Sequence, residues 1–141
     1  MTAKRYLSEL QLMSAKIEQL QEQRQMYLEM ATSITVPFNP VKVQTSRKVD
    51  RIGDNTSKAA DLANEIDEKI DDLWNRQQET IKMIQFLHNA DYMRVLFKVY
   101  VQFKTVKQAA AEMNKSYSYT IELHKKALEA FVTVYADKLG I

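Results

Sequence analysis

The fold is decided by residues 105–120, which read TVKQAAAEMNKSYSYT. Thr105 and Ser116 each precede a run with helical periodicity, so their hydroxyls are placed to cap two helix N-termini. Only residues 114–115 separate the end of the first run from the second cap. Helices joined by so short a turn cross steeply, and the small alanine side chains at 109–110 let them approach closely. The stretch therefore predicts a helix-turn-helix.

The flanking residues supply the rest of a small helical module, predicted over 90–141. Apolar side chains recur every three or four residues in 92–103, 106–113 and 117–139, which gives each segment one apolar face. These faces consist of Tyr92, Val95, Leu96, Val99 and Phe103; Val106, Ala109, Ala110 and Met113; and Thr120, Leu123, Ala127, Phe131 and Val134. Three such faces together make one small core.

Residues 1–34 predict one long helix. Their apolar side chains alternate in spacing between three and four residues, which is a heptad seam in which Arg24 takes one position. The seam consists of Ala3, Tyr6, Leu10, Met13, Ile17, Leu20, Tyr27, Ala31 and Ile34. Both prolines of the chain follow it, so residues 35–54 are predicted to be a linker, either a functional loop or a mobile connection.

A second long helix is predicted over 55–89, with Asn55 or Thr56 as its N-cap and Trp74 in its buried face. The fold class is therefore all-α: a long N-terminal helical arm or an antiparallel helical hairpin, followed by a three-helix helix-turn-helix module. In the hairpin the two apolar stripes cover each other, whereas in the arm each stripe meets a second copy of the chain. Because the seam of 1–34 is too apolar to stay exposed, self-association through the N-terminal helices is expected.

Composition excludes several classes of function. The chain has no cysteine, which excludes disulfides and thiol chemistry, and only two glycines, too few for phosphate-cradling loops. No nucleophile lies beside a candidate base, so we expect neither an enzyme nor a cofactor. His124 has no second histidine at ligand spacing, and the acidic residues of 61–72 share their helix face with lysines, so no metal site is expected. No stretch approaches 18 apolar residues, so we expect no membrane association and a cytoplasmic location.

The sequence from Thr105 to Leu128 resembles region four of the primary bacterial sigma factors. In that family a threonine opens the first helix, a serine or threonine opens the recognition helix, and an Ala-Leu pair closes it. Thr105, Ser116 and Ala127-Leu128 stand at these places here. The resemblance implies that the second helix of the unit contacts double-stranded DNA.

A closer resemblance is to a family of small phage and prophage proteins of Gram-positive bacteria. It is carried by Tyr117-Ser118-Tyr119, Leu123-His124 and Ala127-Leu128, and by a linker that contains Ser46 and Asp50. Members join a long-helix N-terminal half to a C-terminus similar to region four, and they include activators of late or packaging genes. This resemblance implies a transcriptional regulator at the nucleoid of the bacterial host cell.

The expected recognition helix departs from region four because it offers no arginine for bidentate contact with guanine. Bases are instead expected to be read by Tyr117, Ser118, Tyr119, Ile121 and Glu122. Phosphate contacts are expected from Lys104, Lys107, Lys115 and Lys125, with Thr105, Gln108 and Ser116 at helix starts near the DNA backbone. Residues 91–141 carry a net charge of +3, which is modest for a DNA-binding module.

The expected function is sequence-specific regulation of transcription, in which the helical arm dimerises or contacts RNA polymerase. One alternative is a phage DNA-packaging recognition subunit, which also joins a helix-turn-helix to helices that assemble into a ring. A second is a coiled-coil adaptor whose C-terminal module binds only protein. A ring of many copies favours packaging, a monomer or dimer favours transcription, and absence of DNA binding at low salt favours the adaptor.

Overall fold

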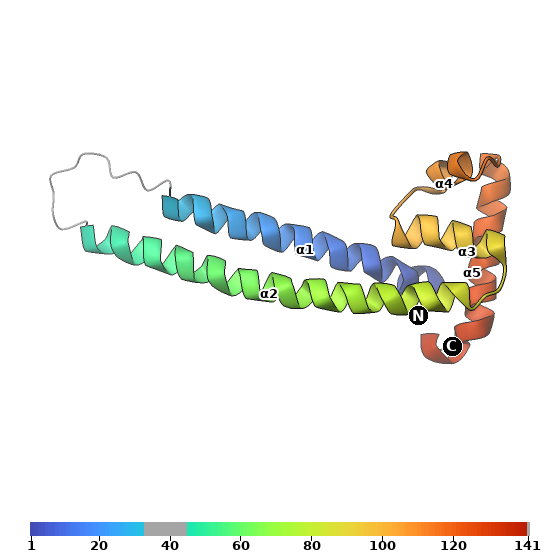
Figure 1. Ribbon diagram of the computed structural model, residues 1–141, viewed down its shortest axis with the longest axis horizontal. Helices are drawn as coiled ribbons and strands as arrows, with labels where there is room; N and C mark the ends of the chain where they lie inside the picture. The colour runs from blue at the N-terminus through green and yellow to red at the C-terminus, as the bar shows by residue number, and fades with distance from the viewer. Residues whose placement is uncertain (33–44, 141) are drawn as a thin grey trace. The chain divides into compact units, whose positions relative to one another are not determined.

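The computed structural model describes residues 1–32 and 45–140, the side chains of 45–50 excepted. Its elements, shown in Figure 1, are α1 (Ala3–Thr32), α2 (Thr45–Gln85), α3 (Ala90–Leu96), a π-helical turn (Phe97–Val101), α4 (Val106–Glu112) and α5 (Tyr117–Leu139). The described residues contain no strand. The predicted all-α class is confirmed.

The chain divides into two compact units, one of Met1–Ser14 and Leu73–Ile141 and one of Ala15–Asp72. The first unit contains the predicted module 90–141 together with the start of α1 and the end of α2. α1 and α2 supply part of the core of the first unit, because the apolar faces of α3 and α5 are not closed by each other alone. These contributions are Ala3, Tyr6, Leu7 and Leu10 from α1, and Met83 and Ile84 from α2.

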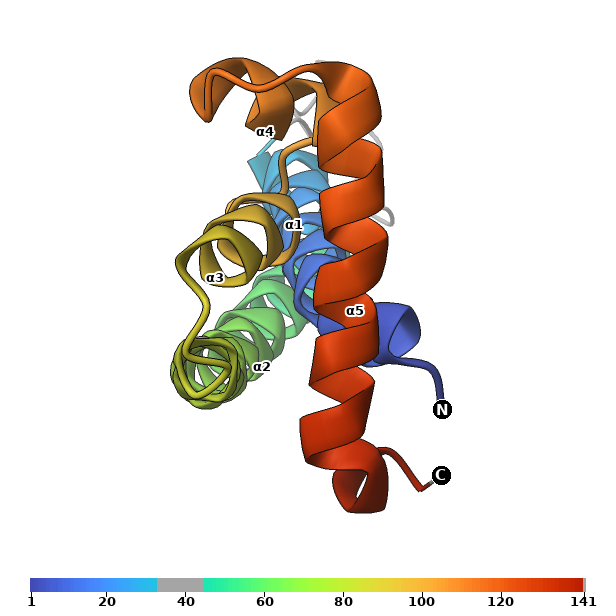
Figure 2. The same cartoon turned by 90° about the vertical axis from the view of Figure 1, so that its right-hand side faces the viewer.

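Within the first unit, the start of α1 runs antiparallel to the end of α2. The Tyr6 hydroxyl donates to Sδ of Met83 at 3.4 Å, and the Arg76 guanidinium donates to the Glu9 carboxylate at 2.8 Å. The same guanidinium lies 4.3 Å from the centre of the Tyr6 ring. Figure 2 shows α3 and α4 on one side of α5, with the start of α1 beside the later turns of α5.

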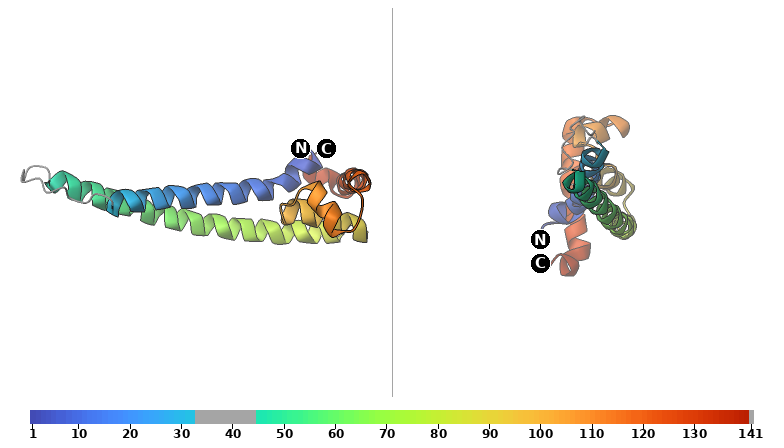
Figure 3. Two further views of the ribbon diagram at one scale, coloured as in Figure 1. Left: turned by 90° about the horizontal axis from the view of Figure 1, so that it is seen from above. Right: turned by 90° about the vertical axis from the view of Figure 1, so that its left-hand side faces the viewer.

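Within the second unit, the rest of α1 runs antiparallel to the first part of α2 (Figure 3). Ile17, Ala59 and Ile66 are buried, and the Lys58 amine lies 5.6 Å from the centre of the Tyr27 ring. The two helices thus pair antiparallel within this unit, as the hairpin alternative predicted, and the seam residues Leu20, Tyr27 and Ala31 are half-buried.

α2 already begins at Thr45. The predicted linker is therefore wrong from Thr45 onward, and neither Asn55 nor Thr56 caps the start of this helix. The apolar stripe extends upstream, with Ile52 half-buried and Asn55 buried, so helix packing outweighs the turn-forming residues of this stretch. The Thr56 hydroxyl donates to the Ile52 carbonyl oxygen at 2.8 Å, which satisfies it inside the helix.

Two apolar residues expected in the core are exposed. Trp74 is 61% exposed because its neighbour Leu73 takes the position that packs on the core. Val134 is 45% exposed, whereas its neighbour Tyr135, where the helical geometry of α5 breaks (φ −116°, ψ 25°), packs on the core and Leu139 is buried. Ile34 and the first part of the predicted linker lie outside the described residues.

Candidate nucleic-acid interface

Thr105 caps α4 as predicted. Its hydroxyl oxygen accepts from the Gln108 backbone N–H at 3.1 Å, and the Gln108 side-chain oxygen accepts from the Thr105 backbone N–H at 2.9 Å. This reciprocal pair is a capping box, which satisfies two donors that a helix start leaves open. The side-chain oxygen of Gln108 is therefore already hydrogen-bonded, and its side-chain amide hydrogens remain available for contact with DNA.

The turn between α4 and α5 is closed by backbone hydrogen bonds. Asn114 has φ 56°, a left-handed conformation that asparagine tolerates better than most residues. Its N–H donates to the Ala111 carbonyl at 3.3 Å, and the N–H of Lys115 donates to the Ala110 carbonyl at 3.0 Å. This is the Schellman pattern, which ends one helix and redirects the chain within two residues.

Ser116 then caps α5, also as predicted. Its hydroxyl oxygen accepts from the Tyr119 N–H at 3.1 Å. The Thr120 hydroxyl donates to the Ser116 carbonyl oxygen at 2.8 Å, and Thr120 is fully buried. The first turn of α5 is thus held by bonds to Ser116, in which its exposed side chains take no part.

α4 packs against α5, and three alanines of these two helices are buried. Ala109 and Ala127 have no exposed surface, and Ala110 is 3% exposed. Leu123 is also buried beside them. The close approach that was predicted from residues 109–110 is confirmed.

The outer face of the first turns of α5 is open to solvent. Tyr117 is 52% exposed and Tyr119 is 47% exposed, and Ser118 and Glu122 are exposed as well. Ile121 is only half-buried, so part of its side chain remains available. The structure brings the five expected reading residues onto one stretch of helix.

The expected phosphate-binding lysines differ in their surroundings. Lys107 is exposed on the first turn of α4, and the Lys115 amine lies 5.6 Å from the centre of the Tyr119 ring. The Lys125 amine lies 3.6 Å from the Glu122 carboxylate, and both side chains are about two-thirds exposed. An exposed pair of this kind is worth about 0–1 kcal/mol, so it is easily exchanged for a phosphate.

Lys104 faces a carboxylate of its own chain. Its amine lies 2.5 Å from Oε1 of Glu112, and the Lys98 amine lies 3.4 Å from the same oxygen. The hydrogen bond and charge of Lys104, followed by those of Lys98, lower the pKa of Glu112. A phosphate that binds Lys104 therefore competes with Glu112 for its ammonium group.

Residues 37–131 match the family described as "Protein of unknown function (DUF1492)". The chain belongs to the DUF1492 family. Neither a curated protein nor a solved structure gives a match. The DUF1492 match contains all twelve expected DNA-contacting residues, from Lys104 to Lys125, whereas α1 lies outside it.

The DUF1492 region also contains a polar pair that sequence reasoning missed. The Tyr100 hydroxyl lies 2.7 Å from Nε2 of His124 and connects the π-helical turn to α5. The predicted helix over 92–103 gave no sign of it, because the turn accommodates an extra residue and Phe103 adopts a left-handed φ of 58°. Only the position of His124 beside the apolar face of α5 hinted at a buried partner.

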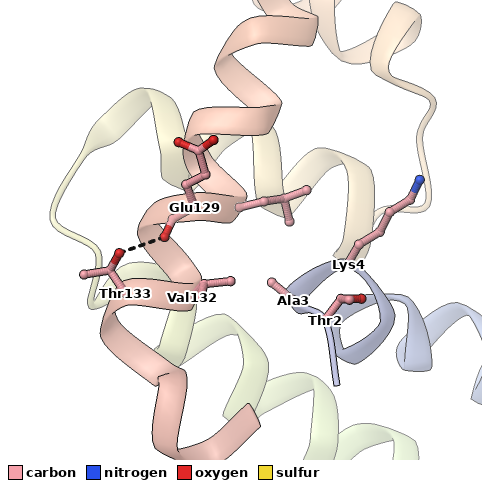
Figure 4. A pocket seen from close by; sticks show the side chains of 7 residues that line it. Thr2, Ala3, Lys4, Glu129, Val132 and Thr133 are labelled. Carbon is pink, nitrogen blue, oxygen red and sulfur yellow. Dashed lines mark hydrogen bonds between the residues drawn. The ribbon is translucent and has the colours of Figure 1, made fainter. Parts of the chain in front are cut away.

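A separate cavity of 460 Å³ lies between the start of α1 and α5. Figure 4 shows Ala3 and Val132 pointing toward each other across it, while the charged ends of Lys4 and Glu129 point away. The cavity therefore has no converging polar groups.

Among the described side chains no cluster is placed to hold a metal ion. Within the same part of the chain, no helix has an apolar run that would span a bilayer.

Proposed function

We propose that this chain is a sequence-specific regulator of transcription that places the first turns of α5 in the major groove of double-stranded DNA. The observation that carries the proposal is that Tyr117, Ser118 and Tyr119 are exposed at the start of a helix whose opposite face is buried against α4. In helix-turn-helix proteins, the N-terminal residues of the second helix contact base edges.

The exposed side chains suit a reading mode without arginine. The Ser118 hydroxyl both donates and accepts, and the Glu122 carboxylate accepts from a cytosine amino group. The tyrosine rings and Ile121 offer apolar contact to thymine methyl groups. Lys107 and Lys115 lie beside the helix starts, where they fix the register of the protein on the phosphate backbone.

The resemblance to region four of sigma factors and to small phage and prophage regulators supports transcription over other uses of DNA. Regulation of late genes and contact with RNA polymerase are the parts of this proposal that rest on the resemblance alone. The helical hairpin is the surface available for that contact.

The test is binding of the full chain to fragments of the DNA of its own source. We expect retention of fragments that share one site upstream of an operon. Ser118→Ala and Glu122→Ala should lose the preference for that site, whereas Glu129→Gln, on a later turn of α5, should keep it. A folded protein that retains no fragment even at low salt would overturn the proposal.

A second candidate function is a protein-interaction adaptor. It is favoured by two large aromatic side chains, Trp74 and Phe86, which are 61% and 62% exposed. Exposed apolar surface of this kind often marks a protein contact. A folded chain that binds a protein partner but no duplex DNA would favour this function.

A further inference from the structure

A groove of 370 Å³ adjoins the helix-turn-helix, between α3, the end of α4 and the turn that follows α4. It is lined by Asp91, Arg94, Lys98, Glu112, Met113 and Lys115. The Asp91 carboxylate is held by Arg94, at 3.6 Å. Lys104, in the loop before α4, also reaches Glu112. Together with the lining residues, this gives four cationic side chains and two carboxylates in or beside the groove.

The position of the Glu112 carboxylate is set by lysines and not by its helix. Glu112 is the last residue of α4, and a negative charge at a helix C-terminus is disfavoured by the helix dipole. Lys104 and Lys98 nevertheless converge on one of its oxygens, and the side chains of both lysines are less than one-third exposed. The carboxylate thus occupies the place of an anion between two ammonium groups.

A phosphodiester oxygen has the same charge as this carboxylate oxygen and accepts from ammonium groups in the same way. Lys115 connects the groove to the reading face, because its side chain lines the groove and lies over the Tyr119 ring. A duplex engaged by the first turn of α5 therefore brings its backbone close to the groove.

We propose that this groove is a binding site for a backbone phosphate, and that the Glu112 carboxylate is an internal competitor which the phosphate displaces. The inference rests on the proposed function for the identity of the ligand. Because the Glu112 carboxylate competes with phosphate for both lysines, it weakens binding to every sequence. Binding then depends more strongly on the base contacts made by α5.

The closing experiment compares Glu112→Gln with Glu129→Gln, which removes the same charge from an exposed position on α5. Two probes are used. Random-sequence duplex DNA is titrated at several salt concentrations, and binding of a short abasic phosphodiester oligomer is measured by the backbone amide NMR shifts of the full chain. We expect Glu112→Gln to bind both probes several-fold more tightly. The slope of log affinity for the duplex against log salt should stay nearly unchanged, because the same lysines meet phosphate in both proteins and only the competing carboxylate is removed.

The site is located by the amides that shift. In the wild-type chain the oligomer should shift the amides of Lys98, Lys104 and Glu112. When Lys98→Gln and Lys104→Gln are added to Glu112→Gln, the gain in affinity caused by Glu112→Gln should disappear. This wild-type measurement keeps the inference testable even where Glu112→Gln does not fold.

Three outcomes would overturn the inference: equal gains for Glu112→Gln and Glu129→Gln, no gain for Glu112→Gln, or no shift at these amides. A chain that binds the oligomer in the groove but no duplex would instead overturn the proposed function and leave the phosphate site standing. A chain that binds duplex through α5 without any shift in the groove would overturn only the inference.

Discussion

The Tyr100 hydroxyl lies 2.7 Å from Nε2 of His124, and the two rings stack with their centres 5.6 Å apart. Burial raises the pKa of Tyr100 to about 12, so the hydroxyl keeps its proton at neutral pH. Burial, and then the charge of Lys4, lower the pKa of His124. The environment of the contact between the π-helical turn and α5 therefore favours a neutral imidazole, and the tautomer of His124 decides which of the two groups donates.

This pair predicts a loss of stability in mild acid. The pKa of His124 is lower in the folded chain than its unfolded value of about 6.5, so the unfolded chain takes up the proton first. The stabilisation is therefore present above about pH 6.5 and is lost as the pH falls through the lower, folded pKa. Urea unfolding between about pH 8 and about pH 5 should show this slope for the wild type and a shallower one for His124→Gln. Equal slopes for the wild type and His124→Gln would contradict this assignment.

Leu7→Ala should destabilise the first unit although Leu7 lies far in sequence from α3 and α5, which it helps to cover. Leu7 has no exposed surface and belongs to the core that includes Val95 and Phe131. Removal of a buried leucine side chain costs about 2–5 kcal/mol. Leu12→Ala, at a position that is 56% exposed on the same helix, should change the free energy of unfolding little. Equal effects of the two variants would show that α1 does not complete this core.

Ala109→Leu should unfold or loosen the helix-turn-helix. Ala109 has no exposed surface, and added volume at a close helix contact costs about 1–3 kcal/mol. The matched control is Ala111→Leu, because Ala111 is exposed on the same short helix. Circular dichroism melts of both variants are the measurement. An Ala109→Leu variant as stable as the control would contradict the close packing of α4 on α5.

Substitutions at Asn114 test the left-handed turn. Asn114→Gly should leave the free energy of unfolding nearly unchanged, because glycine adopts a φ of 56° without strain. Asn114→Ala should cost about 1–2 kcal/mol, since a Cβ disfavours this conformation. Asn75→Ala, at an exposed helical position, is the control and should not destabilise. The turn geometry would be wrong if glycine and alanine at position 114 gave the same stability.

Lys115→Ala and Glu122→Ala should differ in kind when DNA binding is measured. Loss of a phosphate contact at Lys115 should weaken binding to all duplexes alike and lower the salt slope by about one. Loss of a base contact at Glu122 should cost about 1–3 kcal/mol at the preferred site and leave random-sequence binding and the salt slope nearly unchanged. Titrations of specific and random duplex at several salt concentrations distinguish the two. Equal losses on both duplexes for Glu122→Ala would show that it reads no base.

The sequence by itself determined the parts of the fold that depend on neighbours along the chain. The caps at Thr105 and Ser116 were predictable because a capping hydroxyl bonds a backbone N–H only three residues away. The alanines at 109–110 were predictable for a similar reason, since a short turn forces the helices on either side of it together. The same local reasoning placed Ser118 and Glu122 one turn apart on the exposed side of α5.

Only the tertiary structure decided which surfaces meet across long separations. It buried Leu7, which the heptad pattern passed over, and exposed Trp74, which the pattern placed inside. It also joined Tyr100 to His124 and Lys98 to Glu112, pairs that periodicity does not reveal. The physical reason is that helical periodicity shows which face of a helix is apolar but not which partner covers it. That choice depends on the packing of all the helices in the unit together.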